Sequence, residues 1–182
     1  MADKSIAQIF KLISKAKTRE KRIAVLKDYS TFSLRTILQT AVHPDIKLPL
    51  DPGVPNAYTL SFKTPIGKFP KTGKLISIKD PETGKVVGKA IPRPIPPIKP
   101  LDRMLFLEFP HFIPDHPNFM KDKNTREKLW FDFLYCIHPR EAKILIHMKD
   151  KDLLEQTDIV GSLSYDEIQE AWPELELPDL EE

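Results

Sequence analysis

The sequence holds a single cysteine, Cys136, among 182 residues. One thiol cannot form an intrachain disulfide, and it cannot supply the set of thiolates that a structural zinc site needs. The chain also has no apolar run near the roughly 20 residues that a membrane-spanning helix requires, and its start lacks the features of a signal peptide. We therefore expect a protein without disulfides that stays in the cytoplasm and has no membrane partner.

The motifs that mark common enzyme classes are also missing. Gly84 and Lys85 are followed by Val86, so there is no phosphate-binding P-loop. The chain has no dinucleotide-binding glycine motif, no Gly-x-Ser-x-Gly elbow, no His-Glu-x-x-His zinc motif and no Lys-x-Asp-Gly adenylation motif. These absences favour a binding protein over an enzyme, and we expect neither a cofactor nor a resident metal.

Two groups of residues carry metal-binding or nucleophilic side chains without a pattern that selects such chemistry. His111 and His116, with Asp115 between them, could supply two imidazoles and a carboxylate to a metal ion. Neither their spacing nor a helical register selects a metal, which favours ordinary loop histidines. Cys136 and His138 are close in sequence, but Cys136 falls in a predicted helix beside Ile137. A buried structural thiol is therefore favoured over a nucleophile.

Charge is distributed very unevenly along the chain, although the net charge is only +2. Residues 1–100 hold 19 Lys and Arg against 7 Asp and Glu, a net charge of +12, and residues 101–182 hold 9 against 19, a net charge of −10. A basic half is typical of proteins with an anionic partner such as nucleic acid. An acidic end is typical of an interaction tail, or of an internal partner for the basic half. The alternative is that both are ordinary solvated faces.

Apolar residues at helical spacing predict three short helices at the start of the chain. Each is preceded by a residue that can cap a helix N-terminus, namely Ser5, Thr18, and either Ser30 or Thr31. The predicted helices end near Ala16, near Asp28 and before Pro44.

From His43 to Pro100 the composition changes to proline, glycine, lysine and β-branched residues, with no helical period. Two runs, 74–79 and 85–91, flank a turn sequence at 80–84 and predict a β-hairpin. The proline-rich run 91–100 predicts an extended polyproline II segment. We interpret residues 48–100 as an insertion in a mainly α domain.

Helical patterns return after residue 100. The sequence predicts a short apolar segment at 101–109 and a long helix capped by Asn124 or Thr125. It also predicts a helix that begins at Pro139 and a last helix that begins after a capping box at Ser164. The expected fold is therefore a small helical domain over residues 1–173, with its core in 1–47 and 101–173, followed by an acidic flexible tail, 174–182.

Basic residues concentrate around the junction of the first two predicted helices. A nucleic-acid backbone is bound by cations and amide donors without base-reading geometry, so such a patch predicts binding with little sequence preference. The alternative is a solvated helix face. The residues expected to contact phosphates are Lys15, Lys17, Arg19, Lys21, Arg22, Arg35 and Lys47.

Motifs at both ends of the chain carry a family resemblance. They are IFKLISKAKTREK at 9–21, LRTILQ at 34–39, HPDIK at 43–47, PREAKIL at 139–145, KDK at 149–151 and EAWPEL at 170–175. Through these motifs the chain resembles small uncharacterised proteins of T-even-like tailed bacteriophages, including phages that infect cyanobacteria.

That family is in turn similar to the helical N-terminal DNA-binding domain of phage ATP-dependent DNA ligases. The resemblance implies contacts with the duplex backbone around Lys47 and in the loop from Lys149 to Ser164, which includes Lys151. In those ligases catalysis belongs to a downstream domain with a Lys-x-Asp-Gly motif, which this chain lacks. The resemblance therefore implies the binding part without the enzyme.

Residues and resemblance together predict a non-catalytic phage accessory protein in the host cytoplasm. It would bind duplex DNA through backbone and shape, in replication, repair or late gene expression. One alternative is an adaptor that binds a replication or transcription protein of phage or host, through the acidic tail or the Ile-Pro run. Another is a structural component of the virion.

Overall fold

Three short helices open the chain, and each begins after a side chain that accepts a hydrogen bond from the first turn. Ser5 caps the first helix, and its own backbone N–H donates to Gln8, so the predicted capping box is present. Thr18 and Thr31 cap the next two helices through their hydroxyl groups. These helices are α1 (Ile6–Lys15), α2 (Arg19–Asp28) and α3 (Phe32–Val42).

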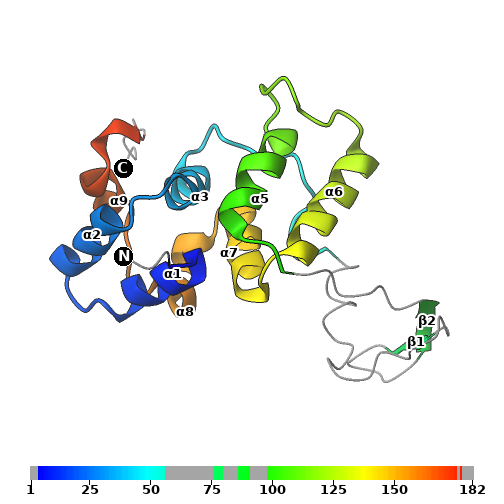
Figure 1. Cartoon of the computed structure of the whole chain (residues 1–182), viewed down its shortest axis with the longest axis horizontal. Helices are drawn as coiled ribbons and strands as arrows, with labels where there is room; N and C mark the ends of the chain where they lie inside the picture. Colours follow the sequence, from blue (N-terminus) through cyan, green and yellow to red (C-terminus); the bar gives the residue numbers. More distant parts are fainter. Residues whose placement is uncertain (1–3, 56–75, 80–85, 91–97, 176, 178–182) are drawn as a thin grey trace.

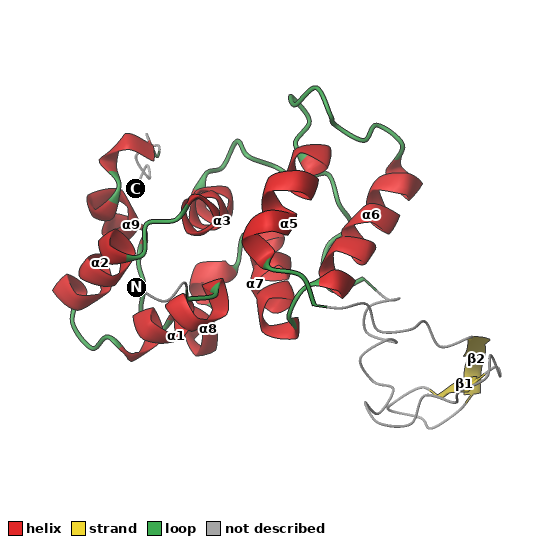
Figure 2. Ribbon diagram, in the orientation of Figure 1, coloured by secondary structure: helices red, strands yellow, loops and turns green. Residues whose placement is uncertain are grey.

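The computed structural model describes residues 4–55, 98–175 and 177, and the backbone of two strands at 76–79 and 86–90. Helices dominate this part of the chain, which confirms the prediction of a mainly α fold (Figures 1 and 2). Among the helices described, none combines the length and the apolar character that crossing a bilayer requires. The helical elements of the second half are α5 (Leu101–Glu108), η1 (Phe109–Phe112), α6 (Lys123–Cys136), α7 (Pro139–Asp150), η2 (Leu153–Glu155), α8 (Thr157–Val160), α9 (Tyr165–Ala171) and η3 (Pro173–Leu175).

The start of α6 differs from the prediction. Asp122 is the capping residue, and its carboxylate accepts a hydrogen bond of 2.7 Å from the backbone N–H of Thr125. A negative charge at this end of a helix is favoured by the helix dipole, so the cap lies earlier than the predicted Asn124 or Thr125. Pro139 begins α7 and a capping box precedes α9, as predicted.

Apolar faces from both ends of the chain meet in one core. Helices α1 to α3 pack against α7, α8 and α9, so segments far apart in sequence lie side by side (Figure 1). The rings of Phe112, Trp130 and Phe133 are buried together, with the closest centroids 5.2 Å apart. Leu48 and Leu177 are also buried, so the core extends beyond its predicted limits at residues 47 and 173.

The chain stays folded after Trp172, where the sequence predicted a flexible tail. The short helix η3 follows directly, and the carbonyl of Leu175 accepts a hydrogen bond of 3.4 Å from the Gln39 side chain. Together with the buried Leu177, this corrects the predicted start of the tail at residue 174. Residues 176 and 178–182 lie outside the described part.

Two short strands, β1 (Ile76–Lys79) and β2 (Val86–Ala90), pair antiparallel where the sequence predicts a hairpin. Ser77 lies opposite Lys89 in their register. Figure 1 shows the pair apart from the helices. The predicted turn and most of the predicted polyproline run lie outside the described residues.

Gly161, which follows α8, allows that helix to approach α1 closely. Its φ is +66°, a conformation that side chains rarely adopt, and a Cβ at this position would lie 2.7 Å from the Cα of Ser14. Only glycine satisfies both constraints. This contact fixes the end of α8 against the C-terminal turn of α1.

We expect the G161A substitution to destabilise the fold by about 3 kcal/mol, because it adds backbone strain to a steric overlap. The thermal midpoint should fall by roughly 6 to 12 °C in a calorimetric or circular-dichroism melt. The matched control is G53A, because Gly53 also has a positive φ, +75°, but a methyl group there would meet no described atom within 4 Å. Equal losses of stability in the two variants would contradict the close approach of α8 to α1.

Candidate nucleic-acid interface

Arg22, one of the residues expected to contact DNA, is buried and paired inside the protein. Its guanidinium donates two hydrogen bonds to the Glu167 carboxylate, at 2.9 and 2.5 Å, and one to the carbonyl of Ala16 at 3.2 Å. The side chains are 10% and 3% exposed. Burial opposes ionisation, but the hydrogen bonds from Arg22 and the backbone of Ser164 hold the pKa of the Glu167 carboxyl below its ordinary value. This bidentate pair joins α2 to α9.

Two further glutamates neutralise two more of the predicted arginines. Glu170 lies 2.6 Å from Arg19, and Glu174 lies 2.7 Å from Arg35. Both pairs are partly exposed, so each stabilises the fold by less than about 1 kcal/mol. The Arg35 guanidinium also lies 5.5 Å from the centre of the Trp172 ring. At these positions the acidic end of the chain is the internal partner of the basic half.

Lys149 and Lys151 are also turned toward the protein. The Lys149 side chain is 2% exposed, and its ammonium donates to the carbonyl of Asp51 at 2.8 Å and to the Asp150 carboxylate. Lys151 donates to the carbonyls of Thr40 and of the residue that follows α3, His43, the latter at 2.8 Å. Burial lowers the pKa of Lys151 to about 8, and the charge of Lys47 contributes. These lysines hold the chain after α3 in place.

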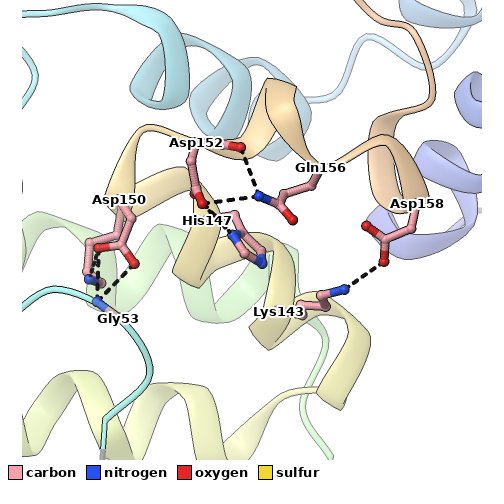
Figure 3. A network of polar contacts seen from close by, with 8 residues as sticks. Gly53, Lys143, His147, Asp150, Asp152, Gln156 and Asp158 are labelled. Carbon is pink, nitrogen blue, oxygen red and sulfur yellow. Dashed lines mark hydrogen bonds and ion pairs between the residues drawn. The ribbon is translucent and has the colours of Figure 1, made fainter.

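The entrance to the insertion is held by a buried arginine that sequence reasoning did not single out. Arg126 on α6 donates to the carbonyls of Pro49 at 2.8 Å and Met120 at 2.7 Å. Asp150 accepts a hydrogen bond of 3.0 Å from the backbone N–H of Gly53, as Figure 3 shows. The first residues of the predicted insertion, 48–53, are therefore anchored to the helical domain.

Four accessible cations line a groove of about 500 Å³ between α1, α7 and α8. Lys11 and Lys15 come from the exposed side of α1, and Arg140 and Lys143 come from the first turns of α7. Lys11, Lys15 and Arg140 form no ion pair within the described part of the chain, whereas Lys143 lies 2.6 Å from Asp158. The groove therefore carries four cations against one carboxylate.

A buried carboxylate aligns the two helices that form the walls of this groove. Glu141, in the first turn of α7, is 4% exposed and accepts hydrogen bonds from the backbone N–H groups of Ala7 and Ile6 at the start of α1. Burial raises the pKa of the Glu141 carboxyl, and the charge of Asp102 adds to this effect, while those hydrogen bonds oppose it. These two N–H groups lie in the first turn of α1, where they have no acceptor within the helix, and Glu141 of α7 supplies one.

A short polar network, shown in Figure 3, holds α8, the third helix that lines the groove. The Nδ1 atom of His147 lies 3.0 Å from the Asp152 carboxylate, and the Gln156 side chain donates to the same carboxylate at 3.1 Å. These contacts fold the segment after α7 back along that helix. They place α8, with Asp158 and Ile159, beside the groove.

The sequence-predicted site residues are therefore not brought together as one patch. Lys15 lies in the groove, and Lys17, Lys21 and Lys47 are exposed. Contacts within the protein engage the remaining predicted residues, Arg19, Arg22, Arg35, Lys149 and Lys151. Sequence reasoning missed the groove residues Lys11, Arg140 and Lys143, although Lys11 and Lys15 stand four residues apart on the exposed side of an amphipathic helix.

Aromatic side chains lie both in the core and on the surface. Trp130, Phe133 and Trp172 are core residues. Phe32 and Phe106 are 64% and 69% exposed and contact one another edge to face, with centroids 6.4 Å apart. They form an exposed aromatic pair between α3 and α5.

The histidines considered as metal ligands serve loop contacts. His111 Nδ1 lies 2.8 Å from the carbonyl of Asn118, and His116 Nδ1 accepts a hydrogen bond of 3.1 Å from the N–H of the same residue. Within the ranges that the structure describes, no group of three or more His, Cys, Asp or Glu side chains is placed to hold a metal ion. Cys136 is the last residue of α6 and is half-buried, not fully buried as predicted.

We expect E167Q to destabilise the fold by about 3 kcal/mol or more near neutral pH, because Arg22 stays buried without a counter-charge. Folding lowers the pKa of the Glu167 carboxyl from its ordinary value of 4.5. The ionised carboxylate therefore stabilises the fold fully above pH 4.5, and this stability is lost as pH falls through the lowered pKa. Urea unfolding of the parent and of E167Q as a function of pH should therefore converge in acid. The control E170Q removes only a surface pair and should cost less than about 1 kcal/mol. An equal cost for both would contradict the buried pair.

Searches with this chain find no matching family model, no matching curated protein and no matching solved structure. The resemblance to phage proteins, and through them to the ligase domain, stays a prediction from the motifs quoted above.

Proposed function

We propose that this protein is a non-catalytic accessory protein of a tailed phage that binds duplex DNA through its phosphate backbone, in the basic groove between α1 and α7. The observation that supports the proposal most strongly is the set of three accessible cations, Lys11, Lys15 and Arg140, which face one hollow without internal partners among the described residues. Exposed cations of this kind bind phosphates by releasing condensed counterions.

The arrangement favours backbone contacts over base reading. The cations come from two separate helices and lie on opposite walls of the groove, so they suit a run of phosphates better than the edges of bases. With four cations and the single carboxylate of Asp158, the lining has a net charge of +3. Binding should therefore be strong at low salt and show little sequence preference. Such binding would suit an accessory role in DNA replication, repair or late gene expression.

The test is to neutralise the groove and measure the salt dependence of binding. In K11Q/K15Q/R140Q we expect affinity for a labelled duplex to fall steeply at low salt. The slope of log K against log salt should become shallower by about 2 to 3, because each phosphate contact contributes roughly 0.9. Fluorescence anisotropy across a salt series measures both quantities.

The matched control is K27Q/K121Q/K128Q, which removes the same charge from three exposed lysines outside the groove. It should keep most of the affinity. Equal losses in the two variants would show that net charge alone determines binding. A parent protein that does not bind DNA at about 50 mM salt would remove the proposal.

A protein-binding adaptor is the second candidate, and the exposed pair of Phe32 and Phe106 favours it. Large apolar side chains exposed together, here with the half-exposed Leu107 beside Phe106, are common at protein-binding surfaces. The two functions differ in one respect that is simple to observe. Capture of a partner through the aromatic pair would survive nuclease treatment, whereas capture through bound DNA would not.

A further inference from the structure

Asp158 already occupies one end of the basic groove. Its carboxylate lies 2.6 Å from the ammonium of Lys143, although both side chains are about half exposed or more. The hydrogen bond from Lys143 lowers the pKa of the Asp158 carboxyl, which is therefore ionised near neutral pH. One of the four cations of the groove is thus held by an anion that belongs to the protein itself.

We infer that Asp158 is a built-in competitor for phosphate, whose carboxylate takes the place of a phosphate oxygen at Lys143 and so limits how tightly the groove binds nucleic acid. The inference rests on the proposed function, because it concerns the regulation of the same site. A bound phosphate would have to draw Lys143 away from Asp158, or leave that cation unused.

The position of Asp158 supports a role as a fixed competitor. The segment before α8 is held to α7 by the network of His147, Asp152 and Gln156 (Figure 3). The residue after α8, Gly161, is held against the backbone of α1. Because α8 is fixed on both sides, the backbone that carries Asp158 cannot move away from the groove without loss of these contacts.

The alternative is an ordinary surface ion pair with no effect on ligands. Such pairs contribute little to stability, so their removal is nearly neutral for the fold. Here, however, the pair lies in a hollow whose other cations, Lys11, Lys15 and Arg140, have no ion-pair partner among the described residues. A carboxylate close to an incoming phosphate repels it, and the repulsion is screened as salt rises.

The experiment compares D158N with the parent in the full chain, with the labelled duplex as probe. We expect D158N to bind about three- to tenfold more tightly at about 50 mM salt, with the gain shrinking as salt rises. The control D115N removes the same charge from the exposed loop before α6 and should change affinity by less than about twofold. Matching thermal midpoints for all three proteins confirm that the fold is kept.

A double-mutant cycle separates competition from a general charge effect. In the parent background K143Q should leave the slope of log K against log salt unchanged, because Lys143 contacts Asp158 and not a phosphate. In the D158N background the same substitution should make the slope shallower by about 0.9, because Lys143 there contacts a phosphate. An equal change of slope in the two backgrounds would overturn the inference.

The outcomes distinguish this inference from the proposed function. If the parent binds DNA and K11Q/K15Q/R140Q does not, but D158N binds no tighter, Asp158 is an ordinary ion-pair partner and the binding function stands. If neither the parent nor D158N binds at low salt, both proposals fail. If D158N alone binds, the groove is a phosphate site that Asp158 closes.

Discussion

The buried pair of Arg22 and Glu167 is the contact on which the arrangement of this protein depends. It joins a helix near the start of the chain to one near the end, over a separation of 145 residues. A guanidinium this deeply buried is tolerated because the carboxylate balances its charge and, with the carbonyl of Ala16, accepts three hydrogen bonds from it. With α9 fixed on α2 in this way, the preceding α8 is held where it forms a wall of the groove beside α1.

This contact also explains why the basic residues divide into two sets. The glutamates at positions 167, 170 and 174 pair with the arginines of α2 and α3, and so neutralise those cations, of which Arg22 is also buried. The lysines of α1 point to the other side, where the N-terminal turns of α7 add an arginine and a lysine. Some of the basic residues are therefore neutralised within the molecule, and those of the groove remain available to a ligand.

Local features were predictable from the sequence, because capping and helical periodicity act over a few residues. Ser5, Thr18 and Pro139 were identified from such patterns, and each begins or caps a helix in the structure. The roles of the cations were not predictable. Arg22 and Lys15 stand in the same basic run, and only a glutamate 145 residues away makes one internal and leaves the other exposed. The internal role of Lys151 could not be predicted either, because its acceptors are main-chain carbonyls, which every residue has and which leave no pattern in the sequence.

The most direct test of this division is an NMR titration of the isotopically labelled protein with a short duplex at low salt. We expect amide and side-chain shifts to concentrate at Lys11, Lys15 and Arg140, while the guanidinium signal of Arg22 stays unchanged. Shifts confined to the face formed by α2 and α3, with the signals of α1 and α7 unaffected, would contradict this division. In that case the arginines, and not the groove, would form the interface.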